Sequence, residues 1–449
     1  MKFKSYSFKE LLSNIVDNRG KTCPVGDAGL PLIATNCIKE HSLYPVFEKV
    51  RYVSDETYTN WFRGHPQPGD MIFVCKGSPG RVNWVPDPVN FCIAQDMVAI
   101  RADTTKVYPK YLFALLRSQA SQQKILNMHV GSLIPHFKKG DFGNLYFELP
   151  EDLEYQKKVG DAYFDFCLKI ESNNQLNQTL EEMAQAIFKS WFVDFEPVKA
   201  KMNGEQPEGM DAVTASLFPE KLVYTDAGEL PEGWKLVPVG ELLDKTIGGD
   251  WGKEVPDEKH TEEVRIVRGT DIPKLHGGAI ESVPVRYVES KKLKTRKLER
   301  GDIVIEVSGG SKDQPTGRSL FISDNILKRL EMPSEPASFC RRFKPKSYEI
   351  GLLLAVHFQL MYQAGKTWEY QNQSTGISNF QTKYFLEAEH VVIPSDDVLD
   401  VFVKQVSPMM DMIHSNQNIE LAKLRDTLLP KLLSGEIELG TSEELVEAI

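Results

Sequence analysis

The sequence predicts an α+β fold in which two long antiparallel coiled-coil helices separate two globular α/β domains. Three observations predict it. One long apolar stripe runs through residues 150–197, a related stripe runs through 394–437, and strand and loop motifs of 1–149 recur in order in 230–393. A pseudo-two-fold internal repeat explains all three. The 449 residues are also too many for one ordinary domain.

The first stripe has residues spaced by four and three in strict alternation. It comprises Val159, Tyr163, Phe166, Ile170, Asn173, Asn177, Leu180, Ala184, Ile187 and Trp191. This spacing is typical of one seam of a left-handed coiled coil. A helix of this length measures about 55–60 Å, and its apolar stripe requires a partner helix.

The sequence supplies that partner near its C-terminal end. Residues 394–437 have a related stripe that includes Phe402, Val406 and Met409, and residues 413–418 resemble 170–175. Two related long helices about 240 residues apart indicate an internal duplication.

The globular segments repeat as well. Residues 69–75 and 301–307 are both a Gly-Asp turn followed by an apolar strand, and a turn ending in Gly-Arg follows each. We expect short helices over 8–16 and 110–128, the second of them matched by 349–363. The predicted ranges are 1–149 and 230–393 for the domains, 150–197 and 394–437 for the long helices, 198–229 for a connector, and 438–449 for an acidic tail.

Composition narrows the class of protein. Hydrophobic residues make up 41% and charged residues 26%, as in soluble globular proteins. No stretch has the length and apolarity of a membrane span. The six cysteines lack metal-ligand spacing and are expected to be reduced, so we expect no metal site. The net charge of −10 argues against a chain that coats nucleic acid, but basic residues gather in 291–300 and 341–346.

Catalytic motifs are missing. The sequence has no phosphate-binding GxxxxGK[ST] loop, no GxSxG elbow, no HExxH helix and no Asn-Pro-Pro-aromatic motif of adenine methyltransferases. We therefore expect no catalytic residues. Two similar globules at a fixed separation instead suit a protein that reads two sites on one rod-shaped ligand.

Several short motifs, taken together and in order, carry a family resemblance. They are Leu-Pro-Glu-Gly-Trp at 230–234, Arg-Gly-Thr-Asp-Ile at 268–272, Gly-Asp-Ile-Val at 301–304, Ser-Gly-Gly-Ser at 308–311, Pro-Thr-Gly-Arg at 315–318, and the runs 180–197 and 424–437. In these motifs the chain resembles the specificity (S) subunit of type I restriction–modification systems. Residues 76–80 match least well, as expected if the two domains read different DNA sequences.

The resemblance implies a mechanism. Each globule is a target-recognition domain that reads one half of a bipartite double-stranded DNA target, while the helices set the spacer length and dock two modification (M) subunits. Those subunits would hold S-adenosylmethionine and methylate adenine at N6. Restriction (R) subunits, with ATP and Mg²⁺, would complete the complex in the cytoplasm of a bacterium or archaeon. This chain would hold no cofactor, contact no membrane and catalyse nothing.

Two rival functions stay open. One is a self-contained DNA-modifying enzyme with fused recognition domains. The other is a non-catalytic coiled-coil adaptor, which would lack sequence-specific, salt-dependent DNA binding.

Candidate DNA contacts lie in polar loops, where small residues let the backbone approach and longer side chains reach phosphates or base edges. They are Lys76, Ser78, Arg81, His129, Ser132, Lys138 and Lys139 in the first domain, and Ser308, Ser311, Lys312, Arg318, Gln371, Asn372, Gln373 and Ser374 in the second. The alternative is that these residues form ordinary solvated turns. Arg81 and Arg318 occupy matched positions, so a shared scaffold role is a second alternative for them.

Polar residues interrupt the long stripes. Asn173 and Asn177 lie near the middle of the first, and Asn416 is the repeat equivalent of Asn173. Buried asparagines in coiled coils cost stability and fix register. We hypothesise that Asn173 and Asn416 meet across the seam and help fix the half-site spacing. The alternative is that the stripe is exposed to water at this point.

Overall fold

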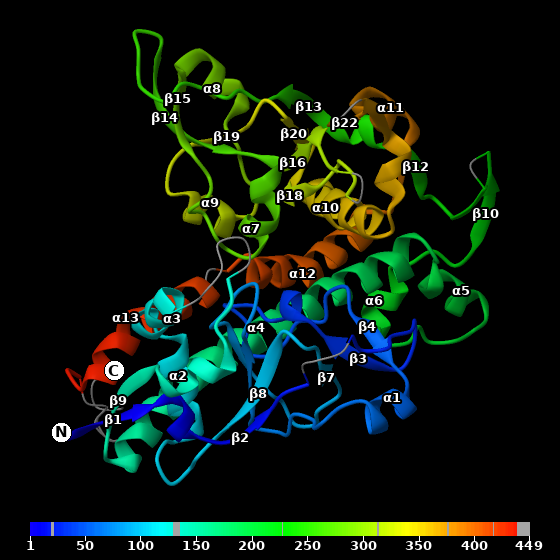
Figure 1. Cartoon of the computed structure of the whole chain (residues 1–449). Coiled ribbons are helices and arrows are strands. Elements are labelled where there is room, and N and C mark those ends of the chain that lie inside the picture. The colour runs from blue at the N-terminus through cyan, green and yellow to red at the C-terminus, as the bar shows by residue number, and fades with distance from the viewer. Residues whose placement is uncertain are drawn as a thin grey trace, which may run out of the picture. The chain divides into compact units, whose positions relative to one another are not determined.

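A computed structural model describes residues 1–18, 22–128, 135–226, 228–311, 314–374, 377–415 and 417–437 (Figure 1). The chain divides into two compact units. Unit 1 contains Met1–Asn173 with Glu420–Ile449, and unit 2 contains Asn174–Ile419. These units divide the long helices between them, whereas the ranges predicted from the sequence keep each helix whole.

Three small sheets build the first repeat, which lies in unit 1. A four-stranded sheet has the order β2-β8-β5-β6, a three-stranded sheet the order β4-β3-β7, and β1 pairs with β9. The strands are β1 (Phe3–Ser7), β2 (Leu12–Val16), β3 (Leu30–Ile33), β4 (Arg51–Val53), β5 (Met71–Val74), β6 (Val82–Trp84), β7 (Cys92–Ile93), β8 (Met97–Ala102) and β9 (Tyr146–Pro150).

The second repeat, in unit 2, uses the same plan. Its sheets are β13-β20-β16-β18, β15-β14-β19 and β12-β23, with an additional sheet β17-β22-β21. The strands are β12 (Lys235–Pro238), β13 (Leu243–Gly248), β14 (His260–Val267), β15 (Val285–Glu289), β16 (Ile303–Glu306), β17 (Ser308–Gly309), β18 (Ser319–Phe321), β19 (Ser334–Pro336), β20 (Cys340–Pro345), β21 (Gln371–Ser374), β22 (Ile377–Phe380) and β23 (His390–Ile393).

The Gly-Asp turn before the central strand has the same construction in both repeats. The buried carboxylate of Asp70 accepts from Gln67 N at 2.8 Å and pairs with Arg101 Nε at 2.7 Å. Asp302 accepts from Glu299 N at 2.6 Å and pairs with Arg342 Nε at 2.7 Å. Buried carboxylates are tolerated when they are paired and hydrogen-bonded in this way.

Shorter elements connect the strands. The α-helices are α1 (Asp55–Asn60), α2 (Pro109–Arg117), α3 (Gln119–Met128), α7 (Ile272–His276), α8 (Ser290–Arg296), α9 (Asp324–Leu330), α10 (Tyr348–Gln363) and α11 (Thr382–Ala388). The 3₁₀ turns are η1 (Phe8–Leu11), η2 (Thr35–Cys37), η3 (Lys139–Gly143), η4 (Val239–Leu242), η5 (Gly269–Asp271) and η6 (Lys366–Tyr370). The connector contains α5 (Glu196–Met202), α6 (Ala212–Ser216) and the paired strands β10 (Leu222–Thr225) and β11 (Gly228–Pro231).

Two helix predictions need correction. Residues 8–16 form η1 and then β2, because a capping box between Ser7 and Glu10 closes only one turn and the next residues pair with β8. The helix predicted over 110–128 is divided at Ser118. There the Ser118 hydroxyl donates to Leu115 O and accepts from Ser121 N, so this residue ends α2 and starts α3. The matched helix predicted over 349–363 is found, as α10.

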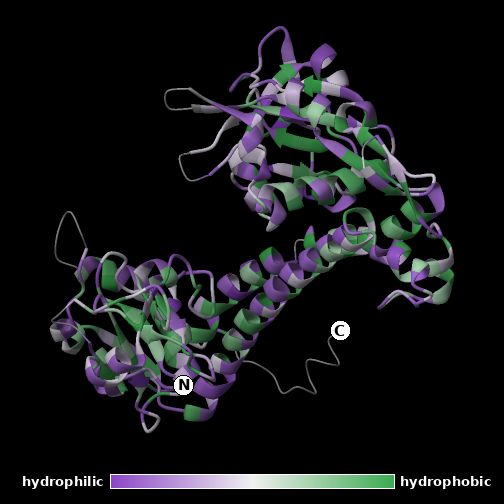
Figure 2. Ribbon diagram, turned by 90° about the vertical axis from the view of Figure 1, so that its right-hand side faces the viewer, coloured by the Kyte–Doolittle hydropathy of each residue, from purple (hydrophilic) through white to green (hydrophobic). Residues whose placement is uncertain are grey.

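The first long helix is α4 (Leu153–Phe192), a continuous run of 40 residues. The helix predicted over 394–437 is found as two, α12 (Asp396–Ile413) and α13 (Gln417–Ser434). The buried His414 caps the end of α12, and its Nδ1 lies 3.0 Å from Ser323 Oγ. Apolar and polar residues alternate along these helices (Figure 2).

The long helices pack antiparallel within each unit. In unit 1, Tyr155 Oη donates to Leu432 O at 2.6 Å, while Arg425 Nη1 lies 3.7 Å from Cys167 Sγ further along α4. In unit 2, the rings of Phe192 and Phe402 are 5.0 Å apart, and Asn418 Nδ2 donates to Asn174 Oδ1 at 2.7 Å. Within each unit, residues further along α4 thus contact residues earlier in the partner helix, as in an antiparallel pair.

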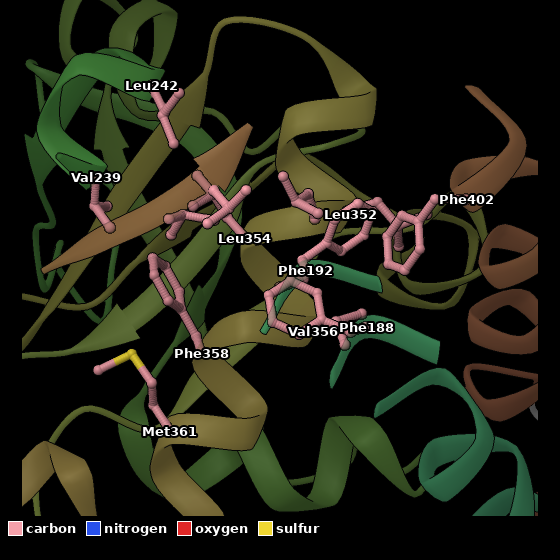
Figure 3. Packing of buried hydrophobic residues seen from close by; sticks show 14 of the residues in the cluster. Phe188, Phe192, Val239, Leu242, Leu352, Leu354, Val356, Phe358, Met361 and Phe402 are labelled. Carbon is pink, nitrogen blue, oxygen red and sulfur yellow. The ribbon is translucent and has the colours of Figure 1, made fainter. Parts of the chain in front are cut away.

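The core of unit 2 joins helices to sheets. Phe188 and Phe192 of α4, Phe402 of α12, and Leu352 and Val356 of α10 are all buried and gather in one cluster (Figure 3). Full burial of each such side chain contributes roughly 1.5–3 kcal/mol. Phe188 and Phe192 lie outside the predicted stripe, because a straight helix packed against a domain buries a wider face than one coiled-coil seam.

Candidate nucleic-acid interface

In the first repeat, the loop after β5 brings two distant segments together. Residues 76 and 136 form a β-bridge, Gly77 N donates to Pro135 O at 2.9 Å, and Phe137 N donates to Cys75 O at 2.9 Å. The fully buried ring of Phe137 anchors the second segment beside Phe142, with ring centroids 5.4 Å apart. Lys76 and Lys138, which the sequence assigns to separate loops, therefore lie in one loop cluster.

The charges of this cluster differ in availability. Lys76 and Lys138 are exposed, and Ser78 and Arg81 are partly exposed. Lys139 Nζ lies 3.2 Å from Asp17 Oδ2, so an acid partly neutralises it. The predicted contacts His129 and Ser132 lie outside the described residues.

The second repeat builds the corresponding corner as a small sheet. Ser308 of β17 faces Asn379 of β22, which in turn faces Asn372 of β21. The Ser308 hydroxyl donates to Asn379 Oδ1, and Gln381 Nε2 donates to Asn372 Oδ1 at 2.8 Å. Ser308, Asn379 and Asn372 thus form one polar row across three strands, and the amides of the row are held in place by neighbours.

The other predicted contacts of the second repeat have mixed surroundings. Gln371 Oε1 accepts from Thr316 N at 3.1 Å, so this side chain braces the neighbouring turn. Ser311 is exposed, and its N–H donates to Gln314 O at 2.8 Å. Gln373 and Ser374 belong to β21 by their backbone, but their side chains and Lys312 lie outside the described residues.

Arg318 is held by an acid. Its Nε donates to Glu306 Oε2 at 2.9 Å and its Nη2 to Glu306 Oε1 at 2.6 Å. The two side chains are 14% and 3% exposed, so the pair is largely withdrawn from water. Donation of these hydrogen bonds to Glu306 raises the pKa of Arg318. This geometry favours the scaffold alternative for Arg318.

A second buried carboxylate, that of Glu389, holds the residue that directly precedes β21. Glu389 accepts from His357 Nε2 at 2.8 Å, from Lys366 Nζ at 2.8 Å and from Tyr370 Oη at 2.5 Å. Burial alone would raise the pKa of Glu389, but these three donors lower it to about 2. Because Tyr370 directly precedes β21, the hydrogen bonds of Glu389 fix the start of this strand, which carries Asn372 of the polar row.

Sequence reasoning missed Asn379 and Glu306. Residues 377–380 are Ile-Ser-Asn-Phe, two polar residues between two apolar ones, so the sequence does not indicate which of the two polar side chains reaches the surface. Glu306 is a charge within the apolar run 303–307, and such a charge needs a partner. Only the strand pairing identifies that partner as Arg318.

The aromatic residues of the connector region pack inward. Trp191 and Phe195 are buried and contact Phe218 and Trp234 in unit 2. Trp251 is 40% exposed, and the Arg286 guanidinium lies over its ring at 5.3 Å.

In the stripe of α4, Asn173 is buried and Asn177 is partly exposed, while Asn416 lies outside the described residues.

No helix among the described residues has the length and apolarity needed to cross a membrane. Within the same residues, no group of three or more His, Cys, Asp and Glu side chains is arranged to hold a metal ion.

Comparisons with known proteins point to one family. A model described as "Type I restriction modification DNA specificity domain" matches residues 29–182. The HindI specificity subunit of Haemophilus influenzae is 25% identical over 417 residues, covering 82% of this chain and 86% of that protein. The MjaIX specificity subunit of Methanocaldococcus jannaschii is 26% identical over 340 residues, covering 74% and 69%.

A solved structure shares the fold. The type I restriction–modification S subunit from M. genitalium matches with a TM-score of 0.54 and 15% identity, over 96% of each chain. Residues 29–182 thus match the model of a type I restriction–modification DNA specificity domain, and the chain as a whole is similar in sequence and in fold to type I specificity subunits.

Proposed function

We propose that this chain is the DNA sequence-recognition subunit of a type I restriction–modification complex, and that each repeat reads one half of a bipartite double-stranded target. One observation carries the proposal. The same framework occurs twice and presents different polar side chains at the same corner: Lys76 opposite His136 in the first repeat, Ser308 opposite Asn379 in the second. A protein that reads two unlike half-sites needs this combination.

The chain itself would supply recognition and no chemistry. Two modification subunits would bind S-adenosylmethionine and methylate adenine at N6, and restriction subunits would use ATP and Mg²⁺. The paired helices α4, α12 and α13 would set the spacer and dock the modification subunits. The two relatives, both named specificity subunits, support this division of work. We place the complex in the cytoplasm, where chromosomal DNA is available.

Reconstitution of the complex tests the proposal. The full chain would be combined with the modification subunits of its own system, and N6-methyladenine would be mapped after reaction with S-adenosylmethionine. We expect one asymmetric bipartite motif with adenines methylated on opposite strands. Methyl transfer by this chain alone would favour the enzyme alternative. A complex without salt-dependent, sequence-specific DNA binding would favour the adaptor.

Half-site variants then test the assignment of each repeat. Asn379→Ala should relax or change only one half of the motif, and Lys76→Ala should affect the other half. Each substitution lies on the surface of its own repeat, so each serves as the matched control for the other. A change in both halves by either variant would contradict separate readout.

A further inference from the structure

Matched backbone hydrogen bonds pair residues of the two repeats one to one at the loop after the central strand. In the first repeat, Val74 N donates to Arg81 O at 2.9 Å and Gly80 N donates to Val74 O at 3.0 Å. In the second, Glu306 N donates to Arg318 O at 2.9 Å and Gly317 N donates to Glu306 O at 3.1 Å. Arg81 therefore corresponds to Arg318, and Val74 corresponds to Glu306.

The second repeat is shaped around its ion pair. A Cβ atom at Gly269 would lie 2.3 Å from Glu306 Oε1, and one at Gly309 would lie 2.6 Å from the same oxygen. Both glycines therefore leave room for the carboxylate that holds Arg318. A buried, bidentate pair of this kind leaves Arg318 little freedom to bind another anion.

The first repeat lacks the carboxylate and one of the two glycines, because Val74 stands at the position of Glu306 and Thr35 at that of Gly269, while Gly77 matches Gly309. Val74 is fully buried in an apolar cluster with Ile72 and Met97. Thr35 begins the turn η2, where Gly269 begins the corresponding turn η5, so a side chain now occupies the space that the carboxylate required. Arg81 keeps the guanidinium but has no ion pair with any described residue.

The position of Arg81 suits an external anion. The side chain is partly exposed, and its loop also carries the exposed Lys76. A partly exposed arginine with no internal acid adds positive charge without stabilising the fold through a pair. Guanidinium groups bind phosphates and the O6 and N7 atoms of guanine through paired N–H donors.

We infer that Arg81 contacts the DNA of the first half-site, whereas Arg318 holds the second recognition loop through Glu306 and does not contact DNA. This inference rests on the proposed function. It assigns different roles to Arg81 and Arg318, which occupy matched positions in the sequence. It predicts that equivalent substitutions will fail in different assays: DNA binding for Arg81, and folding stability for Arg318.

The test uses the complex of the full chain with its modification subunits, with DNA affinity measured against salt concentration and thermal unfolding measured in parallel. Arg81→Ala should weaken binding roughly 5- to 150-fold with an unchanged unfolding temperature. Lys9→Ala removes the same charge from an exposed position of the same repeat and is the control. Arg81→Lys distinguishes a phosphate contact from a guanine contact. If Arg81 binds a phosphate, lysine can replace it and the recognised motif stays the same. If Arg81 binds guanine, the substitution relaxes the specificity at one base of the motif.

Swapping the acid tests the contrast between the repeats. Val74→Glu with Thr35→Gly installs the carboxylate and its space, and should reduce binding as Arg81→Ala does. Glu306→Val with Arg318→Leu removes the second pair together and should leave DNA affinity within about twofold, since apolar pairs replace buried ion pairs at little cost. The inference is overturned if Arg81→Ala binds like the parent complex, or if the Glu306 and Arg318 double variant folds but loses DNA. Failure of the parent complex to bind any specific DNA would instead refute the proposed function.

Discussion

The two repeats place the same strands in the same order but fill equivalent positions with different chemistry. Where the second repeat buries Glu306, Glu335 and Glu389, the first has Val74, Cys92 and Leu145. The matches follow from equivalent backbone bonds, such as Phe8 N to Leu145 O and Val239 N to Glu389 O. Equivalent positions of the same strand framework thus hold either a buried carboxyl group or an apolar side chain. At Val74, the apolar side chain leaves Arg81 without an ion pair among the described residues.

The largest effect is expected at the Glu306 pair. Glu306→Ala leaves Arg318 largely buried without its acid, so we expect a loss of about 3–4 kcal/mol in the free energy of unfolding of unit 2. Urea unfolding of the purified chain measures it. The matched control is Glu306→Val with Arg318→Leu, which should recover most of the loss. If the single substitution costs no more than the double one, the pair does not stabilise the second repeat.

Glu335 should make the second repeat sensitive to alkali. It is fully buried, both carboxylate oxygens lack hydrogen-bond partners among the described residues, and burial raises its pKa to about 7. Because the folded state holds the proton more tightly than the unfolded state, stability declines as pH rises from about 4.5 through 7. Glu335→Gln should therefore be more stable than the parent at pH 8 by up to about 3 kcal/mol.

Unfolding curves at pH 5 and pH 8 check this prediction. At pH 5 the parent and Glu335→Gln should differ little, because the native carboxyl is already neutral. Cys92→Ser, at the equivalent position of the first repeat, retains Glu335, so its difference in stability from the parent should be the same at pH 5 and pH 8. Equal stability of the parent and Glu335→Gln at pH 8 would show that Glu335 is not held neutral.

Glu389 should have the opposite pH dependence. Its pKa is lowered to about 2, so the stability that it contributes is present above about pH 4.5 and is lost as pH falls toward 2. Glu389→Gln at neutral pH weakens three hydrogen bonds from partners that include charged groups, and should cost about 2 kcal/mol. Hydrogen exchange should then become faster in β21 and β22, while exchange in the first repeat should stay as it was.

The smallest effect on stability, about 1 kcal/mol, is expected at Asn173 and its repeat equivalent Asn416. Asn173→Leu with Asn416→Leu replaces polar stripe positions by apolar ones and should increase stability slightly. If these residues fix the register, the same variant should methylate targets with altered or mixed spacer lengths. A single, unaltered spacer would show that the two repeats keep their spacing without them. Asn174→Ala is the control, because Asn174 is exposed and its bond to Asn418 lies at the edge of the seam.

The sequence predicted the structure best where a local pattern is compatible with few conformations. The Gly-Asp turns before β5 and β16, the long helix α4 and the helix α10 all lie where their patterns predict. Apolar runs with fixed turns leave few alternatives. Divided helices were harder, because Ser118 and His414 act through side-chain hydrogen bonds that helical periodicity does not contain.

The candidate site was predictable as a set of loops but not as a set of partners. The sequence places Arg81 and Arg318 at matched positions, yet only cross-strand pairing shows that Glu306 holds one of them. Likewise, the joining of Lys76 with residue 136 depends on contacts across 60 positions of sequence. Local patterns locate polar loops, whereas charge neutralisation depends on non-local geometry.

Each repeat also begins and ends on neighbouring strands. Phe3 pairs with Pro150 in the first, and Lys235 pairs with Ile393 in the second, directly before α4 and α12 respectively. Adjacent strands lie only about 5 Å apart, so the backbone enters and leaves each domain at neighbouring points. A whole repeat can therefore be exchanged for another by two cuts at one place, without breaking a sheet. Under the proposed function, such an exchange would give the chain a new half-site specificity while its helices stayed the same.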